Sequence, residues 1–280
     1  MTRFQTPSVA ICALLFAVSA AGCSPASPTP SPTPLSDPTQ IVTLSFARLQ
    51  ASTSLHIQGT ISGSVDVSAA GALVGFGSPF LSGKIKLDGA TLRGDVDMAN
   101  QALSLTALFP SLFGSSAQVI VVDGYAYTKV KLPLSVGDDK YKKSKVDAQR
   151  LMPSAAPNAT FNFSEALKQF DPQIASIAAT AVLVGQDTVD GRPAYHLLVT
   201  VPADMVNQAI GAALGSAAGG LSVEVAPADY WVYDDSLTPA GLLLKVSSPT
   251  LGNVAVSVTL TKYNQSVAIQ APPDSQVSAG

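Results

Sequence analysis

The stretch "LHIQGTISGSVDV", Leu55 to Val67, decides the fold because its apolar and polar side chains alternate strictly. Leucine, isoleucine, glycine and valine take every second position, and histidine, glutamine, threonine, serine and aspartate take the others. In an extended chain, every second side chain points to the same face. A long alternating segment of this kind is typical of a β-strand with one face in the core and one in solvent. Such half-buried strands are characteristic of antiparallel sheets.

Further strands are predicted on the C-terminal side of this segment. The stretch "GKIKLDGATLRGDVDM" repeats the alternation, while "AQVIVVDGYAYTKV" and "VLVGQDTVDGRPAYHLLVTVP" are predicted hairpins. Their Asp-Gly pairs at 123–124 and 190–191 match the two central positions of a type I′ turn. The stretches "YWVYDD", "GLLLKVSS", "NVAVSVTLTKY" and "SVAIQAPP" predict the last strands. Glycines within strands allow the sheet to curve sharply.

Helical patterns interrupt the strands in three places. Residues Gln40–Ser54 predict a short helix. The stretch "FSEALKQFDPQIASIAA" predicts a second, with Ser164 as its N-cap and Pro172 limiting its first half. Ala203–Ala218 predicts a third, rich in alanine and glycine. Gln101–Gly114 is apolar, breaks at Pro110 and fits no clean period, so it is either core or a mobile flap over a cavity. The predicted class is α+β, a large antiparallel sheet with helices on one face.

The composition excludes some functions. Of the 280 residues, 47% are hydrophobic and only 12% charged, and the net charge is −3, so nucleic acid is a poor partner. After Cys23, no apolar run approaches the roughly 18 residues of a membrane span. The chain must therefore bury its apolar excess in a core or line a cavity with it.

The N-terminal region predicts a lipid anchor. Val9–Ala21 is an apolar run of about 13 residues, which suits the h-region of a signal peptide. Ala20-Ala21-Gly22-Cys23 resembles a bacterial lipobox, with alanine where leucine is commoner. Cys12 would leave with the signal, so the mature chain would keep Cys23 alone, and lipidation would block its thiol. The alternative is an ordinary secretion signal followed by an incidental cysteine.

A tether follows the cysteine. Ser24–Thr39 contains six prolines, which favours an extended polyproline conformation and cannot form a core. At ~3.1 Å per residue, this segment spans on the order of 50 Å. The predicted organisation is a signal peptide over 1–22, a lipidated cysteine and tether over 23–39, a folded domain over 40–273 and a tail over 274–280.

The order of lipobox, tether, short helix and long alternating strands resembles the LppX/LprA/LprF/LprG lipoproteins of mycobacteria and related bacteria. The segments that carry the resemblance are "VDGYAYTKV", "GQDTVDGRPAYHLLVTVPA", "YWVYDDSLTPAGLLLKVSS" and "GNVAVSVTLTKYNQSVAIQAPP". The resemblance implies a strongly curved half-barrel with helices on its concave face, as in the LolA/LolB carriers. Between sheet and helices it implies an apolar cavity for the acyl chains of envelope lipids or glycolipids.

The site candidates follow from the predicted lipid anchor and from the cavity that the resemblance implies. Only Cys23 is carried over from the family residue by residue. Small side chains in the segment after Ala203 would leave room for acyl chains between helix and sheet. The cavity candidates are Leu105, Leu108, Phe109, Phe113, Met205, Ile210, Ala213 and Leu214. The candidates for a basic rim that meets anionic headgroups are Lys140, Lys142, Lys143 and Lys145. Core packing for the first set and a solvated loop for the second remain alternatives.

The expected function is a non-enzymatic carrier, anchored at the outer face of the cytoplasmic membrane, which takes lipid across the envelope space as a monomer. No cofactor is expected, and family members often work alongside a membrane exporter. One alternative is a structural or signalling lipoprotein with a filled core. The other is a lipid-acting esterase or acyltransferase. That enzyme would need His56 or His196 beside a serine or aspartate that opens onto a cavity; the chain has no G-x-S-x-G elbow and no Cys/His cluster.

Overall fold

The computed structural model describes residues 35–66, 84–112, 114–131, 139–146, 162–207, 222–249 and 252–278. Contacts divide the chain into two units, Met1–Pro34 and Leu35–Gly280, and all the described residues belong to the second. The predicted signal peptide, Cys23 and residues 24–34 of the predicted tether therefore lie outside the described residues.

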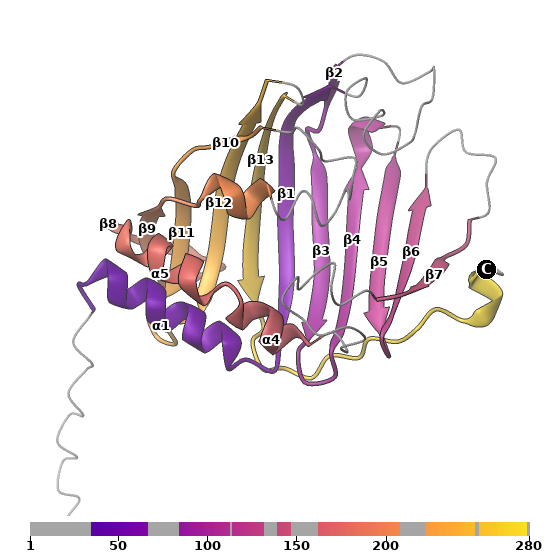
Figure 1. The fold of residues 1–280 in the computed structure, drawn as a ribbon, viewed down its shortest axis with the longest axis horizontal. Coiled ribbons are helices and arrows are strands. Elements are labelled where there is room, and N and C mark those ends of the chain that lie inside the picture. Colours follow the sequence, from indigo (N-terminus) through magenta and orange to yellow (C-terminus); the bar gives the residue numbers. More distant parts are fainter. Residues whose placement is uncertain are drawn as a thin grey trace, which may run out of the picture. The chain divides into compact units, whose positions relative to one another are not determined.

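A single 13-stranded antiparallel sheet dominates the fold (Figure 1). Its strands follow the order β7-β6-β5-β4-β3-β1-β13-β12-β11-β9-β8, with β2 paired to β1 and β10 to β12. The strands are β1 (Ser54–Asp66), β2 (Lys84–Lys86), β3 (Ala90–Asp97), β4 (Ala102–Phe109), β5 (Ser115–Val122), β6 (Tyr125–Lys131), β7 (Lys142–Lys145), β8 (Val182–Val189), β9 (Arg192–Val199), β10 (Glu224–Val225), β11 (Ala228–Tyr233), β12 (Pro239–Ser248) and β13 (Gly252–Thr261). This confirms the α+β class with a large open antiparallel sheet.

The long alternating segment forms the centre of this sheet. Strand β1 pairs on one side with β3 and on the other with β13, from His56↔Thr261 to Val65↔Gly252. Gly63 takes a φ of +113°, which a residue with a side chain rarely adopts. A Cβ there would lie 2.1 Å from the carbonyl oxygen of Asn253. Glycine therefore permits the close β1–β13 contact at this position.

Two tight turns confirm the predicted hairpins. Asp123 and Gly124 have φ values of +53° and +74°, and Asp190 and Gly191 have +49° and +75°. Positive φ at both central positions is the signature of the type I′ turn. These turns join β5 to β6 and β8 to β9.

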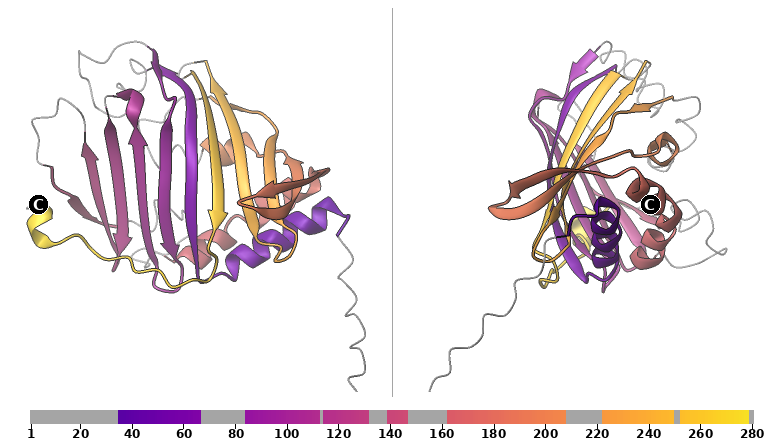
Figure 2. Two further views of the ribbon diagram at one scale, coloured as in Figure 1. Left: turned by 180° about the vertical axis from the view of Figure 1, so that it is seen from behind. Right: turned by 90° about the vertical axis from the view of Figure 1, so that its left-hand side faces the viewer.

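Three helices lie on one face of the sheet (Figure 2). They are α1 (Pro38–Gln50), α4 (Phe163–Lys168) and α5 (Asp171–Ala179), and residues 203–207 add a further helical turn. The Asp37 side chain caps α1 by accepting a hydrogen bond from Thr39 N at 2.9 Å. The prediction of Ser164 as the N-cap of α4 is wrong, because Asn162 Oδ1 accepts from Glu165 N at 3.1 Å. Pro172 stands at the start of α5, as its limiting role in the sequence predicts.

The largest core cluster lies between these helices and one end of the sheet. Ile41 and Val42 of α1 and Ile177 of α5 pack on β9 and β11. A smaller cluster joins Leu167 of α4 to Leu55 of β1 and neighbouring strands. The helix-side face of the sheet is thus defined by the side chains that these helices contact.

Two segments differ from the sequence prediction. Residues 102–109 form the interior strand β4 rather than a flap, because their alternation is hidden by leucine and alanine on both faces. The stretch "SVAIQAPP" forms no strand. It leads instead to a short 3-10 helix, Asp274–Gln276, and to a single parallel bridge between Tyr141 and Val277. In Figure 1 this C-terminal segment runs along the lower ends of the strands toward β7.

Candidate functional site

The helix-side face of the sheet continues beyond the helices as an apolar surface. Leu103 of β4 packs in the cluster under α4, so alternate residues along β4 share its face. The cross-strand partners carry this face outward, from Leu105 to Val119 of β5 and to Gly94 of β3. On the far side of β3, Ile61 of β1 pairs with Val256 of β13. We call this surface the open apolar face, represented by Ile61, Leu92, Leu105, Phe109, Val119 and Val256.

These side chains are half-buried, not buried. Residues of the same face on β9 and β11 are fully covered by helices, with Leu197 and Val232 both 0% exposed. Three glycines, at positions 59, 63 and 94, interrupt the apolar side chains of these strands, and a Cβ at each would overlap a carbonyl oxygen of the neighbouring strand. The result is a broad apolar surface that the described helices leave partly uncovered.

The opposite face of the sheet is polar and carries both histidines. His56 Nδ1 lies 2.7 Å from Asp95 Oδ1 across the β1–β3 pair. His196 bridges two carboxylates, with Nδ1 3.0 Å from Asp187 Oδ2 and Nε2 2.9 Å from Asp229 Oδ1. The ring of His196 also stacks on Trp231 at 4.9 Å. Each histidine therefore has an aspartate within reach.

These aspartate–histidine pairs do not open onto the apolar face. His56 lies between Leu55 and Ile57, and His196 between Tyr195 and Leu197, whose side chains point to the helix side. In the described residues, the side-chain partners of the histidines are carboxylates, an amide and an indole ring. The arrangement lacks the nucleophile that a hydrolase needs beside its histidine.

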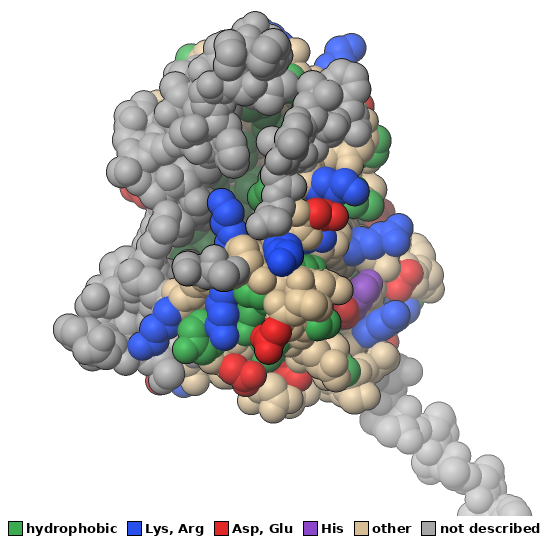
Figure 3. Space-filling view, turned by 90° about the vertical axis from the view of Figure 1, so that its right-hand side faces the viewer, with side chains coloured by type: hydrophobic (Ala, Val, Ile, Leu, Met, Phe, Trp, Pro, Cys, Tyr) green, Lys and Arg blue, Asp and Glu red, His purple; other side chains and the backbone are tan. Residues whose placement is uncertain are grey.

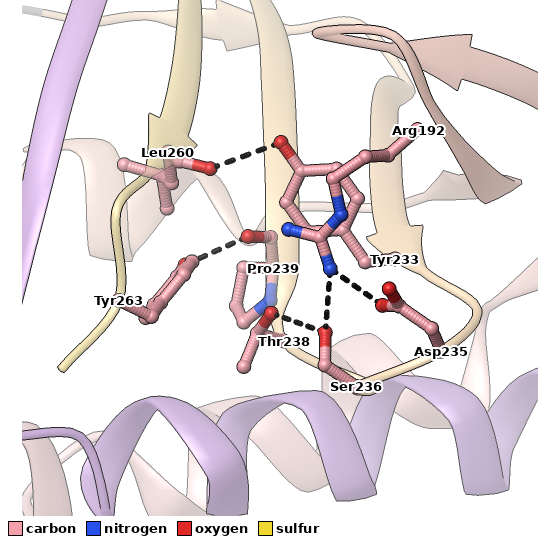
Figure 4. A network of polar contacts seen from close by, with 8 residues as sticks. All are labelled: Arg192, Tyr233, Asp235, Ser236, Thr238, Pro239, Leu260 and Tyr263. Carbon is pink, nitrogen blue, oxygen red and sulfur yellow. Dashed lines mark hydrogen bonds and ion pairs between the residues drawn. The ribbon is translucent and has the colours of Figure 1, made fainter. Parts of the chain in front are cut away.

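A second polar network closes the turn between β11 and β12 (Figure 4). The Arg192 guanidinium stacks on the Tyr233 ring at 3.8 Å and donates to Asp235. Burial alone would raise the pKa of Asp235, but hydrogen bonds from Arg192 and Ser236 outweigh it and lower that pKa. Ser236 Oγ lies 2.8 Å from Thr238 Oγ1. This serine is therefore tied into a network that holds a turn.

The four predicted rim lysines lie along one edge of the sheet. All four residues of β7 are exposed, and Lys140 precedes them. Lys143 Nζ lies 4.2 Å from the centre of the Tyr125 ring. The Lys129 ammonium, 2.9 Å from Asp139, donates the hydrogen bond that lowers the pKa of that carboxyl. Figure 3, which looks onto this end of the molecule, shows lysine and arginine side chains gathered there.

The structure separates the sequence-predicted apolar residues. Leu105 and Phe109 belong to the open apolar face. Leu108 lies on the opposite face of β4, paired with Thr91 and Ser116, and is 43% exposed. The structure thus contradicts the inclusion of Leu108 among the cavity candidates, since strand alternation directs it away from the helices. Met205 packs against the core cluster under α1 and α5. The candidates outside the described residues are Phe113, Ile210, Ala213 and Leu214.

The sequence prediction missed most of the open apolar face as a site. It assigned the cavity to Gln101–Gly114 and to the segment after Ala203, whereas Ile61, Val119 and Val256 lie on strands treated as ordinary core. The signal was available in the sequence: an alternating apolar set interrupted by glycines rather than by large side chains.

Comparisons with known proteins place the chain in a family. A family model described as LppX_LprAFG lipoprotein matches residues 37–269. A comparison with curated protein sequences gives no match. Among the described helices, none combines the length and hydrophobicity needed to cross a bilayer.

Solved structures give the following similarities. LprF from Mycobacterium bovis is 14% identical, with 86% of this chain and 99% of that chain covered and a TM-score of 0.49. The lipoprotein LppX from Mycobacterium tuberculosis is 16% identical, with 83% and 98% covered and a TM-score of 0.45. A LolA superfamily protein from Nitrosomonas europaea is 9% identical, with 86% and 97% covered and a TM-score of 0.23. On the family match over residues 37–269, the chain belongs to the LppX_LprAFG lipoprotein family.

Proposed function

We propose that this protein is a membrane-anchored lipid carrier. It binds the acyl chains of envelope lipids or glycolipids against the open apolar face and takes them across the envelope space. Cys23 supplies the anchor at the outer face of the cytoplasmic membrane, and a membrane exporter is a further partner. The protein acts by binding and not by catalysis.

One observation carries this proposal: the open apolar face is only half-buried, beside a part of the same face that is fully packed. Exposing so much contiguous apolar surface to water is unfavourable, and large patches of this kind mark binding sites. Acyl chains gain roughly 0.8 kcal/mol for each CH₂ removed from water. A lipid is therefore the ligand whose chemistry fits a broad surface of valine, leucine, isoleucine and phenylalanine without a set of polar contacts.

The test uses a matched pair of substitutions on one strand. Leu105→Trp adds bulk to the open apolar face, and Leu108→Trp adds the same bulk to the opposite, exposed face of β4. Native mass spectrometry of the purified proteins would measure the fraction that carries co-purified lipid. We expect lipid on the wild type and the Leu108→Trp variant, and a severalfold lower fraction on the Leu105→Trp variant, because the indole occupies space that an acyl chain needs.

Two outcomes would contradict the carrier. Equal lipid loading in both variants would show that lipid binds elsewhere. A wild type that carries no lipid and takes up no added fatty acid would favour a structural or signalling lipoprotein. Circular dichroism of both variants would confirm that each is folded.

The anchor has its own test. Cys23→Ala, with the signal still cleaved, should move the protein from the membrane fraction to the soluble fraction, because acylation of Cys23 supplies the buried hydrocarbon. Partition of the variant like the wild type would disprove anchoring at Cys23. Ile210, Ala213 and Leu214 stay proposed as a second wall of the lipid site.

A further inference from the structure

The β6–β7 edge of the sheet carries a concentrated positive charge. Over residues 125–131 and 139–146, six lysines stand against a single aspartate, Asp139, although the whole chain has a net charge of −3. The other end of the sheet has the opposite balance, because residues 182–199 and 222–249 contain two basic and six acidic residues. The domain is therefore electrically polarised from one edge of its sheet to the other.

The arrangement of these lysines favours an approach to the edge itself. Lys142 pairs with Thr128, which shares the helix-side face, whereas Lys143 pairs with Tyr127 on the opposite face. The cations thus point to both sides of β7, the last strand in the sheet order. The C-terminal segment bonds to Tyr141, directly before β7, so the approach is to Lys142–Lys145. A flat partner that meets this part of the edge reaches both sets at once, and a partner on either face reaches only one.

Exposed apolar and aromatic groups accompany the lysines. Tyr125 is 39% exposed and Val130 is 55% exposed, both on β6. Lysines alone on an edge strand would be explained as protection against edge-to-edge association. Lysine together with tyrosine and an aliphatic side chain is the composition of a surface at the boundary between water and lipid headgroups.

We propose that the β6–β7 edge docks edge-on to the anionic phospholipid surface of a bilayer. Docking brings the neighbouring open apolar face next to the lipid headgroups, where an acyl chain can pass between bilayer and protein. The inference rests on the proposed carrier function for its purpose, but the docking itself depends only on the charge and placement of the edge.

The experiment uses the mature chain with Cys23→Ala, so that no anchor contributes, and vesicles of phosphatidylcholine with or without phosphatidylglycerol. Each cation beside an anionic membrane contributes roughly fivefold in affinity. We expect salt-sensitive binding to the anionic vesicles and at least an approximately tenfold loss when Lys140, Lys142, Lys143 and Lys145 are all changed to glutamine.

A second quadruple variant is the matched control. Lys84, Lys86, Lys245 and Lys262 are also exposed, and changing them to glutamine removes the same total charge from other parts of the domain. This control should keep affinity within about threefold of the parent, since its cations lie away from the β7 edge.

Three outcomes would overturn docking. The first is an equal loss of vesicle affinity in both quadruple variants, and the second is equal binding to vesicles with and without phosphatidylglycerol. The third is full competition by soluble glycerol phosphate. The last would indicate a headgroup pocket and not a surface. Native mass spectrometry separates this failure from that of the carrier. If the β7 variant still carries lipid but no longer binds vesicles, docking is supported. If the proteins bind vesicles but none of them carries lipid, only the carrier function is rejected.

Discussion

The helix-side face of the sheet contains two regions with the same alternation of apolar and polar side chains, but helices cover only one of them fully. On β9 and β11 the inward side chains are covered by α1 and α5, so that Leu197 and Val232 are 0% exposed. On β4, β5 and β13 the equivalent side chains, such as Leu105, Val119 and Val256, stay half-buried. Alternation along a strand therefore decides which face is apolar, and only the elements above that face decide whether it is closed.

The closed region is held by large and specific contacts. Ser45 of α1 lies 2.7 Å from the Tyr230 hydroxyl, and Phe46 stacks on the same ring. The open region instead has glycines at 59, 63 and 94 and aliphatic side chains from neighbouring strands. The difference is that the helices close one end of the sheet and leave part of the same face half-buried.

A matched pair of truncations should give the largest contrast between the two regions. Leu197→Ala removes a fully buried side chain and should lower the free energy of unfolding by about 2–5 kcal/mol. Leu105→Ala removes a half-buried side chain of the same type and should cost about 1 kcal/mol or less in the lipid-free protein. Urea denaturation measures both. Similar losses would mean that the open region is packed as tightly as the closed one.

The seam between β1 and β13 offers the next test. Gly63→Ala forces a side chain into a φ of +113° and onto the Asn253 carbonyl, and should cost roughly 1–3 kcal/mol. Gly185→Ala on β8 is the control, because its Cβ would meet no atom within 4 Å, and should change stability by about 0.5 kcal/mol or less. Thermal unfolding of both variants decides; an unperturbed Gly63→Ala protein would mean that this seam tolerates bulk.

The closed region should also respond to high pH. Burial raises the pKa of Tyr230 well above its usual 10.0, and its hydrogen bond with Ser45 only partly offsets this. The folded state then keeps a proton that the unfolded state releases, so the stabilisation is complete below about pH 10 and is lost as pH rises. Tyr233 and Tyr263 have pKa values raised in the same direction.

Ionisation of Tyr230 should lower the free energy of unfolding by about 1.4 kcal/mol per pH unit above pH 10. Tyr230→Phe should reduce the measured slope by that amount, because phenylalanine does not titrate. Denaturation curves between neutral and alkaline pH provide the slopes, and an unchanged slope in the variant would place the Tyr230 hydroxyl in a solvated environment.

The sequence predicted the sheet well because its signals are local. Alternation from Leu55 onward and the Asp-Gly turns are set by backbone geometry within a few residues. The strand from Ala102 to Phe109 was harder, because Ala102 and Leu108 on its otherwise polar face remove the period on which the prediction depends. The "SVAIQAPP" segment has strand-like residues but ends in two prolines, which cannot donate hydrogen bonds to a strand ladder.

The open apolar face could be predicted only in part for a different reason. Leu105 and Phe109 were named because they stand in a conspicuous apolar run, and Leu108, which lies on the opposite face of β4, was named with them because a run does not reveal faces. Which strands the helices would cover depends on long-range packing, which no local pattern encodes. The boundary between the closed and open regions therefore had to come from the structure.

The pairing of β1 with β13 has a consequence for the folding of the newly made chain. Partners such as His56 and Thr261 lie roughly 200 residues apart, whereas β3, β4, β5 and β6 pair with their immediate successors in the sequence. As the chain emerges from its N-terminus, β1 can gain one neighbour early but must wait for the last strand to gain the other. Contacts of such separation slow folding, and an unpaired central strand is prone to pair with another chain. Until β13 is made, one edge of β1 therefore has no partner strand. Protection of that edge from other chains during this interval would govern the yield of folded protein.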